Sequence, residues 1–238
     1  MDRRRERERM VDALDVELAS TDAALRAVPR HRFVPEAWRD LAYVDRPLPI
    51  GEGATISSPS VVAAMVDHLA LSTGDRVLEI GTGSGYHAAV VAEVVGAGNV
   101  YSVEYDPDLA ATAGERLADL GYGDVAIRVG DGREGWPEHA PYDAAYATCA
   151  ARDFPPAVVD QVRIDGLLLV PVGIVETRLV LAKKTSSGDL DRLDCGPVQF
   201  VPMRGPESDT DTVFDTDPKN DMDGTTEPSS KDRGENTE

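Results

Sequence analysis

The stretch RVLEIGTGSGY, residues 76–86, sets three glycines between a short apolar run and a helical pattern. Residues 76–80 predict a β-strand and Tyr86–Val95 predict a helix, which makes the glycines the turn between them. The glycines, Gly81, Gly83 and Gly85, permit a tight turn and let a ligand approach the backbone. This order of strand, glycine loop and helix predicts an α/β fold that binds a nucleotide-like ligand.

Strand and helix patterns continue to alternate after this loop. Further strands are predicted at residues 99–104, 125–129, 142–147, 167–172 and 178–183, with a final piece at 198–201, and further helices at 107–120 and 155–162. Repeated β-α units predict a mostly parallel, doubly wound sheet with helices on both faces. The turn Ser186–Asp189 predicts an antiparallel edge at the C-terminal end of that sheet.

The N-terminal part precedes the β-α units. An apolar stripe over residues 11–28 predicts one helix that Pro29 ends, followed by an irregular connector with four prolines. A helix over residues 59–71 follows, with Ser58 as its N-cap and Pro59 at its first position. We therefore predict three parts, listed by residue number: an N-terminal helical extension with a covering loop at 1–58, a ligand-binding core at 59–205, and an acidic, disordered tail at 206–238.

Acidic residues stand at the ends of the predicted strands. Glu104 ends the second strand, where a carboxylate can accept hydrogen bonds from both ribose hydroxyls. Asp131 and Gly132 follow the third strand and are predicted to meet an adenine amino group. Glu79 lies two places before the first glycine, and Thr82 lies within the loop. Because ligands bind at the carboxyl ends of parallel strands, we expect these residues to converge on one cofactor.

The spacing of the glycines favours S-adenosylmethionine over a dinucleotide. The loop reads G-x-G-x-G, and Tyr86 stands where the dinucleotide fingerprint has its third glycine. No basic residue lies in the loop to meet a pyrophosphate, and Glu79 would repel one. The same carboxylate could help to hold a sulfonium or amino group, directly or through the loop backbone.

The charge balance bounds the environment and the partners. The formal net charge is −19, and the chain has 43 acidic residues against 20 Arg and 4 Lys. Residues 207–238 contribute 11 acids and 3 bases, so residues 1–206 still carry −11. Such a surface suits a cytoplasm of very high salt and disfavours nucleic-acid binding. No apolar run is long enough to span a membrane, and the charged N-terminus lacks a signal core, so we expect a cytoplasmic protein, and a monomer.

Histidines and cysteines offer little chemistry in this chain. The four histidines are scattered, at His31, His68, His87 and His139. Their spacing predicts no metal site. His87 follows the glycine loop, so a polar contact near the cofactor is the alternative to a packing role. Cys149 is interpreted as a small packing residue rather than a nucleophile.

Several blocks of the sequence resemble the protein-L-isoaspartate O-methyltransferase family. They are, in order, AVPRHRFVPEAW, DRPLPIGEGATIS, VLEIGTGSGYHAA, RVGDGREGWPEHAPYD and GPVQFVPMRG. The match is colinear from about residue 10 to 205. The glycine loop is shared by many methyltransferases, whereas the blocks before and after it are far more specific. The resemblance implies a Rossmann-like methyltransferase fold.

The resemblance also implies a repair reaction. Members of the family methylate the α-carboxylate of L-isoaspartyl residues in damaged proteins, with S-adenosylmethionine as donor. The family's active-site serine lies in a T-I-S motif, which implies that Ser57 is the catalytic residue and that Thr55, Ile56 and Ser57 bind the substrate. An ionised carboxylate needs no general base, so alignment and exclusion of water are the expected work of the site.

Three departures from the family pattern bear on the substrate. Ala54 replaces a common Gln, Ser58 follows the motif serine, and Arg152 replaces a common Pro and adds a positive charge near the mouth of the site. Two alternatives therefore stay open beside repair. One is a methyltransferase that acts on another carboxylate or a small molecule. The other is a weakly catalytic adaptor that binds S-adenosylmethionine or damaged protein.

Overall fold

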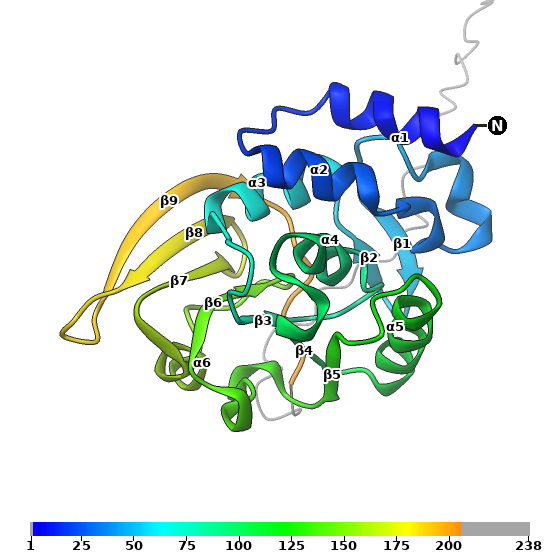
Figure 1. The fold of residues 1–238 in the computed structure, drawn as a ribbon. Helices are drawn as coiled ribbons and strands as arrows, with labels where there is room; N and C mark the ends of the chain where they lie inside the picture. The colour runs from blue at the N-terminus through cyan, green and yellow to red at the C-terminus, as the bar shows by residue number, and fades with distance from the viewer. Residues whose placement is uncertain (1, 206–238) are drawn as a thin grey trace, which may run out of the picture. The chain divides into compact units, whose positions relative to one another are not determined.

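A seven-stranded sheet forms the centre of the protein in a computed structural model that describes residues 2–205 (Figure 1). Its strands are β3 (Val77–Ile80), β4 (Val100–Glu104), β5 (Ala126–Val129), β6 (Tyr142–Ala147), β7 (Val162–Val172), β8 (Thr177–Lys184) and β9 (Leu190–Val198). The strand order is β5-β4-β3-β6-β7-β8-β9. The first five strands in that order are parallel, and β7, β8 and β9 pair antiparallel. The predicted mixed sheet is confirmed.

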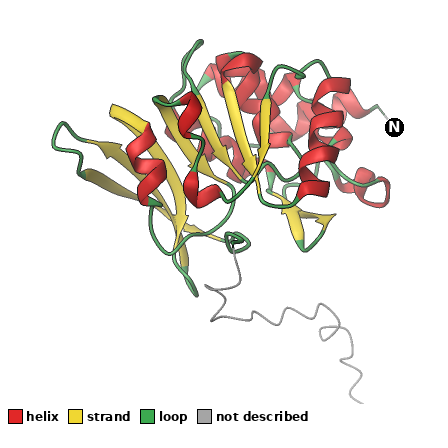
Figure 2. Cartoon of the chain, turned by 90° about the horizontal axis from the view of Figure 1, so that it is seen from below, coloured by secondary structure: helices red, strands yellow, loops and turns green. Residues whose placement is uncertain are grey.

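Helices cover both faces of this sheet (Figure 2). They are α1 (Arg3–Asp12), α2 (Ala19–Ala27), α3 (Pro59–Leu69), α4 (Tyr86–Val95), α5 (Pro107–Asp119) and α6 (Pro156–Gln161). Short 3-10 turns occur at η1 (Arg30–Arg32), η2 (Glu36–Leu41), η3 (Ala97–Asn99), η4 (Gly132–Glu134) and η5 (Pro137–His139). Side chains of α1 to α5 share one apolar cluster with Val77, whereas Val158 of α6 shares another with Leu78. Successive residues of β3 thus pack against opposite helical layers.

The N-terminal stripe forms two helices, so the prediction of a single helix over residues 11–28 is wrong. Helix α1 already ends at Asp12, and α2 begins at Ala19. Asp67 of α3 accepts hydrogen bonds from the amides of Glu17 and Leu18 at 2.8 and 3.2 Å. A carboxylate on another helix therefore holds the N-cap Leu18 and the residue before it, which fixes where α2 starts.

The proline-rich connector contains a β-hairpin that the sequence analysis did not predict. Strand β1 (Leu48–Gly51) pairs antiparallel with β2 (Ala54–Ile56). The two loop residues, Glu52 and Gly53, have φ values of 51° and 67°, which is the pattern of a tight hairpin turn. Leu48 and Ile56 are buried in the main core, so the hairpin is anchored against the molecule.

Helix α3 begins where predicted, but its cap differs. Ser58 occupies the N-cap position and Pro59 follows it, yet the Ser58 hydroxyl makes no capping hydrogen bond. Asp45 accepts the hydrogen bond from the Ser60 amide at 2.9 Å instead. The start of α3 is thus tied to the connector that leads into the hairpin.

The last strand also differs from its prediction. It is β9, Leu190–Val198, and not residues 198–201, although the predicted turn before it does join two antiparallel strands. Most of β9 is exposed at the edge of the sheet, so the apolar periodicity that would reveal it is missing. Residues 2–205 form one compact unit, and the predicted boundary at residue 58 stays a prediction. The predicted acidic tail lies outside the described residues.

Candidate active site

The glycine loop follows β3 as a strained turn that only small residues fit. Gly81, Gly83 and Gly85 have φ values of 94°, 52° and 83°. A Cβ on Gly81 would lie 2.5 Å from the Thr148 hydroxyl oxygen. A Cβ on Gly85 would lie 3.2 Å from Leu117 of α5, so this glycine lets the start of α4 pack closely against α5. The loop combines a reachable backbone with close helix packing.

Glu104, at the end of β4, closes against this loop. Its carboxylate accepts hydrogen bonds from the Gly83 amide at 2.8 Å and from the Asp106 amide at 3.0 Å. The residue is only 7% exposed, and it also lines the cavity beside the loop. The two amides fix the carboxylate at the strand end, where it can accept further hydrogen bonds from hydroxyl groups.

One cavity brings the hairpin, the strand ends and the C-terminal segment together. The predicted residues that line it are Thr55, Gly81, Gly83, Glu104 and Gly132. The other lining residues are Gly53, Ala54, Ile80, Val103, Tyr105, Leu109, Thr148, Cys149, Val201, Pro202, Met203 and Arg204. The segment that contains residues 201–204 runs back from the far edge of the sheet towards β4, in orange in Figure 1. The lining is largely apolar, with acceptors and glycines at the strand ends, as in small-molecule sites.

Glu79 and Thr82 lie behind the cavity rather than on it. Glu79 is fully buried and accepts hydrogen bonds from Ser102 and Tyr146, at 2.5 and 2.7 Å. These two residues are its direct neighbours on β4 and β6 in the register of the sheet. Ser102 also shares a 2.5 Å hydrogen bond with Thr82. Glu79 is therefore connected to the glycine loop through the side chains of Ser102 and Thr82, and its role in holding the cofactor stays a prediction.

Burial makes Glu79 unusual among the carboxylates. Removal from water raises its pKa to about 8, even though hydrogen bonds from Ser102 and Tyr146 oppose that rise. The negative charge of Glu104 adds to the rise. Near neutral pH the carboxyl group is therefore mostly protonated, and it acts as a neutral member of the network behind the loop.

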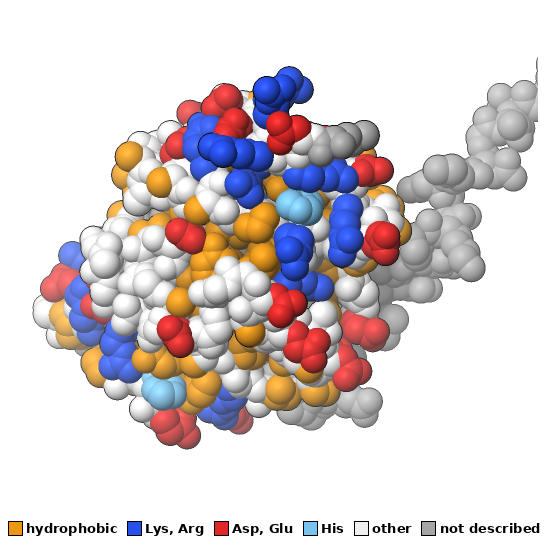
Figure 3. Space-filling model, turned by 45° about the vertical axis from the view of Figure 1, so that its right-hand side comes forward, with side chains coloured by type: hydrophobic (Ala, Val, Ile, Leu, Met, Phe, Trp, Pro, Cys, Tyr) orange, Lys and Arg blue, Asp and Glu red, His pale blue; other side chains and the backbone are white. Residues whose placement is uncertain are grey.

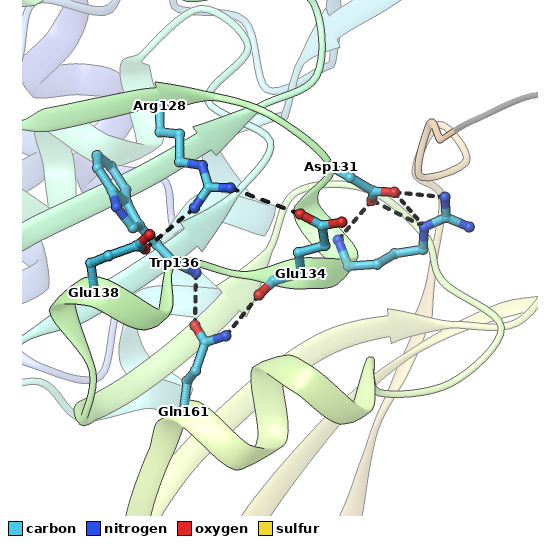
Figure 4. Close-up of polar contacts among 7 residues, drawn as sticks. Arg128, Asp131, Glu134, Trp136, Glu138 and Gln161 are labelled. Carbon is cyan, nitrogen blue, oxygen red and sulfur yellow. Dashed lines mark hydrogen bonds and ion pairs between the residues drawn. The ribbon is translucent and has the colours of Figure 1, made fainter.

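Asp131 faces Arg133 instead of the cavity (Figure 4). Its carboxylate accepts from the Arg133 amide at 2.9 Å and from the guanidinium at 2.7 to 3.1 Å. These bonds hold the pKa of Asp131 below its ordinary value. The neighbouring Gly132 does line the cavity, where a Cβ would come within 2.3 Å of Ile80. Recognition of an adenine amino group by Asp131 stays a prediction.

The turn after Asp131 is fixed by a buried glutamine. Gln161 of α6 accepts from the Trp136 amide and donates to the Glu134 carbonyl, both at 2.7 Å (Figure 4). A Cβ on Gly135 would lie 2.4 Å from the glutamine oxygen, so the turn fits around this amide. Arg128 forms outer ion pairs with Glu134 and with a second glutamate of the same turn. The segment that carries Gly132 is therefore held by Gln161 of α6 and by Arg128 of β5.

Ser57 lies directly after β2, next to the part of the hairpin that lines the cavity. Thr55 is exposed and lines the cavity, whereas Ile56 is buried in the core. Ser57 is half-buried, and its hydroxyl has no hydrogen-bond partner among residues 2–205. The hydroxyl is thus available, and its contact with a substrate stays a prediction.

The remaining candidates fit packing roles. His87 is buried against the Tyr146 ring with a centroid distance of 4.6 Å, and burial lowers its pKa to about 3. Cys149 lines the cavity, but burial raises its pKa to about 12, which keeps the thiol protonated and unreactive. Among residues 2–205, no group of three or more His, Cys, Asp or Glu side chains could hold a metal ion.

His31, in the N-terminal part of the chain, lies near several arginines. Figure 3 shows basic side chains gathered around a histidine on one face, with acidic ones beside them. Burial lowers the pKa of His31, and the positive charges of Arg3, Arg32, Arg7 and Arg39 lower it further. His31 shares a 2.7 Å hydrogen bond with Tyr43, so it too serves the packing of the N-terminal part.

The sequence analysis missed the fourth strand end and the C-terminal part of the cavity. Thr148 and Cys149 follow β6, so extending the rule of strand ends to one more strand would have found them. Tyr105 and Leu109 follow Glu104 in the same way. Residues 201–204 carry no local signal of this role, because their place depends on the path of the chain after β9.

The sheet and the cavity at its strand ends together define the Rossmann-like class of S-adenosylmethionine-binding proteins. The glycine loop, the carboxylate of Glu104 and the absence of any basic lining residue except Arg204 in the described cavity fit an adenosyl sulfonium better than a dinucleotide. No helix in residues 2–205 is long and apolar enough to cross a membrane.

Comparison with known proteins narrows this class to one family. The model of the family described as protein-L-isoaspartate(D-aspartate) O-methyltransferase (PCMT) matches residues 7–208. A relative named protein-L-isoaspartate O-methyltransferase 2, from Archaeoglobus fulgidus, is 48% identical over 209 residues, which cover 86% of this chain and 95% of the relative. The chain therefore belongs to the protein-L-isoaspartate O-methyltransferase family.

Solved structures agree with this assignment. One named protein-L-isoaspartate O-methyltransferase aligns with a TM-score of 0.78 and 29% identity, over 85% of this chain and 66% of the other. A second, described as a putative member from Plasmodium falciparum in complex with S-adenosyl-L-homocysteine, aligns with a TM-score of 0.74 and 21% identity, over 83% and 98% of the two chains. The second shows the fold alone. The predicted family and fold class are confirmed.

Proposed function

We propose that this protein methylates the α-carboxylate of L-isoaspartyl residues in damaged proteins. Family membership makes it a methyltransferase, with S-adenosylmethionine as the methyl donor. One observation supports the substrate assignment most directly: Thr55 of the T-I-S motif lines the same cavity as Gly83 and Glu104. The hairpin that carries this hydroxyl thus borders the same cavity as the strand ends that would hold the cofactor.

The lining residues fit the adenosyl cofactor by their chemistry. In the proposal, Glu104 accepts the ribose hydroxyls, and the backbone of Gly81 and Gly83 contacts the amino-acid part. Thr82 and Glu79 hold that loop from behind, and Gly85 sets its packing against α5. Asp131 and Gly132 meet the adenine edge. S-adenosylmethionine supplies a methyl group on a sulfonium sulfur, which passes to a carboxylate oxygen as the carbon–sulfur bond breaks and leaves S-adenosylhomocysteine.

The hairpin side of the cavity would orient the carboxylate that accepts the methyl group. An isoaspartyl carboxylate is ionised near neutral pH, so its oxygen is a nucleophile without the help of a base. The described lining offers no free base, because Glu104 is bonded to two amides and the Cys149 thiol is protonated. Ser57 would donate a hydrogen bond to the carboxylate, and Thr55 and Ile56 would form the lip that excludes water.

A labelled-methyl transfer assay tests the proposal. Matched peptides with Asp or L-isoAsp at one position are incubated with the protein and S-adenosylmethionine that carries a labelled methyl group. Base-labile label on the isoAsp peptide alone is expected. Label on another carboxylate or a small molecule would favour a different methyltransferase, and cofactor binding without transfer to any acceptor would favour the adaptor.

Ser57→Ala separates the role of the serine from cofactor binding. The loss of one donor to the reacting carboxylate should lower kcat about 10- to 100-fold, with cofactor affinity within about twofold of wild type. Ser58→Ala is the matched control, because within the described residues that hydroxyl bonds only to Ser60, at 3.3 Å. Equal turnover in Ser57→Ala and wild type would remove the serine from the mechanism.

The proposal extends to the setting of the enzyme: a monomer in a cytoplasm of very high salt. The net charge of −19 with only 4 Lys supports it, because dissolved ions screen the repulsion between carboxylates. Unfolding followed in multimolar potassium chloride and in about 0.1 M salt tests this, since the free energy of unfolding should rise strongly with salt. Equal stability in both would contradict it, and light scattering gives the oligomeric state.

A further inference from the structure

The segment after β6 is built into the wall of the cavity. Thr148 and Cys149 line the cavity directly. The Ala150 amide donates to the Val201 carbonyl at 2.8 Å, and the Ala150 carbonyl accepts from the Met203 amide at 2.7 Å. Val201 and Met203 line the cavity as well, so this short stretch is hydrogen-bonded to the C-terminal part of the cavity wall.

The next residue ties the same stretch to the turn between β7 and β8. The Ala151 amide donates to the Pro171 carbonyl, and the Ala151 carbonyl accepts from the Gly173 amide, both at 2.9 Å. Arg152 follows at once, and its Cα lies at most about 11 Å from that of Cys149, because the chain spans no more than about 3.6 Å per residue. The backbone hydrogen bonds of Ala150 and Ala151 therefore fix the chain just before Arg152.

Arg152 is a free cation at this place. It is exposed, and within residues 2–205 it has no hydrogen-bond or ion-pair partner. The adjacent Asp153 is engaged by Arg192 at 2.8 Å. Glu176, on the neighbouring turn, is exposed and interacts with Arg178. The acidic groups nearest in the two segments thus face other arginines.

Two exposed apolar residues follow Gly173, whose amide bonds to the residue before Arg152. Ile174 and Val175 follow Gly173 in the β7–β8 turn and are 40% and 88% exposed. Their exposure leaves apolar area that a bound polypeptide can cover. Arg152, Ile174 and Val175 together are called the rim below.

We propose that the rim seats the polypeptide on either side of the methylated residue, with Arg152 selecting an acidic neighbour. This inference rests on the proposed function. Its basis is charge complementarity, because an otherwise acidic protein would repel an acidic segment, whereas Arg152 offers a local attraction. Ile174 and Val175 would cover an apolar part of the same segment regardless of its charge.

Peptides that differ only beside the isoaspartyl residue test this inference. Glu, Gln or Lys is placed next to L-isoAsp, first on one side and then on the other, and kcat/KM is measured at the lowest salt at which circular dichroism shows folded protein. Wild type should prefer Glu over Lys by about three- to fivefold on one side, the size expected of one exposed ion pair. Arg152→Ala should abolish the preference, and Arg152→Glu should invert it.

Control variants separate the rim from a general charge effect. Arg163→Ala removes an exposed arginine at the start of β7 that is paired with Asp143, and it should keep the wild-type order of peptides. Val175→Ser should raise KM about threefold for all peptides alike. Added salt should erase the preference for Glu, because it screens exposed charges.

The outcomes distinguish the two proposals. If wild type methylates all the isoAsp peptides equally, the rim inference fails while the proposed function stands. If Arg152→Ala keeps the order of wild type, or Arg163→Ala loses it equally, Arg152 is not the selecting residue. If wild type methylates none of the isoAsp peptides, the proposed function itself fails, and the rim inference falls with it.

Discussion

Arg204 donates a hydrogen bond to the backbone carbonyl of Glu52, which lies 152 residues earlier in the chain. The same guanidinium forms an ion pair with Asp106 at 3.3 Å. It thereby joins the C-terminal segment to the hairpin turn and to the start of α5. All three segments contribute residues to the lining of the cavity or border it directly. Arg204 therefore closes one end of the cavity.

Arg204→Ala should loosen this end of the cavity. The arginine is 44% exposed, so its ion pair is screened by solvent and contributes little, but its hydrogen bond to a carbonyl is charge-assisted. We expect the Kd for S-adenosylhomocysteine to rise about three- to tenfold, mainly through faster dissociation. Stopped-flow fluorescence measures both rates. Arg163→Ala, which breaks an ion pair with Asp143 on the sheet, is the control and should leave them unchanged.

Gly83→Val should abolish cofactor binding. Gly83 lines the cavity with a φ of 52°, and its amide is held by Glu104 at 2.8 Å, so a branched side chain would strain the turn and fill the approach to the backbone. Gly74→Val is the matched control, because Gly74 also has positive φ, at 91°, but is surrounded by open space. Both variants should lose about 1–3 kcal/mol of stability. Calorimetric titration should show that only Gly83→Val loses the cofactor.

Much of this site can be predicted from local sequence, because the residues at each strand end directly follow their own strand in the chain. The pattern around Gly81 and Glu104 is contiguous, and the structure places both on one cavity as expected. Asp131 shows the limit of such reasoning. Its position after β5 is as predicted, but a side chain two residues away, Arg133, takes its carboxylate.

Features that depend on distant partners could not be predicted in the same way. The start of α2 is fixed by Asp67, about 50 residues away, so no local signal separates α1 from α2. Strand β2 has three residues, too few for a periodic pattern, and its turn uses Glu52 where Asn or Gly would have signalled a hairpin. Residues such as Arg204 acquire their role only when the chain returns across the sheet.

Glu79→Gln should remove a pH dependence of stability. The folded pKa of Glu79 is about 8 and its ordinary value is 4.5, so between these values the unfolded chain binds fewer protons than the folded one. The free energy of unfolding therefore falls as pH rises through this window, and the full contribution is present below pH 4.5. Glutamine imitates the protonated carboxyl, and the variant should lose less stability than wild type between about pH 6.5 and 8.

Urea unfolding at several pH values measures this difference. The depressed pKa of His87 is common to both proteins, so it cancels when the two curves are subtracted. Glu115→Gln, an exposed change on α5, serves as the control for charge removal. Parallel curves for wild type and Glu79→Gln would show that Glu79 is ionised in the folded protein at neutral pH, contrary to the raised pKa.

Gln161→Leu should destabilise the turn that carries Gly132. The glutamine is 8% exposed, and its loss leaves the partly buried Trp136 amide and Glu134 carbonyl without these partners. Such unsatisfied groups cost about 1–3 kcal/mol, which should appear in the free energy of unfolding by urea. The Kd for S-adenosylhomocysteine should rise as well, because Gly132 lines the cavity. Gln199→Leu, at an exposed position, should change the free energy of unfolding by less than about 0.5 kcal/mol. If Gln161→Leu lowers stability but leaves the Kd unchanged, the turn stabilises the fold without positioning Gly132 for cofactor binding.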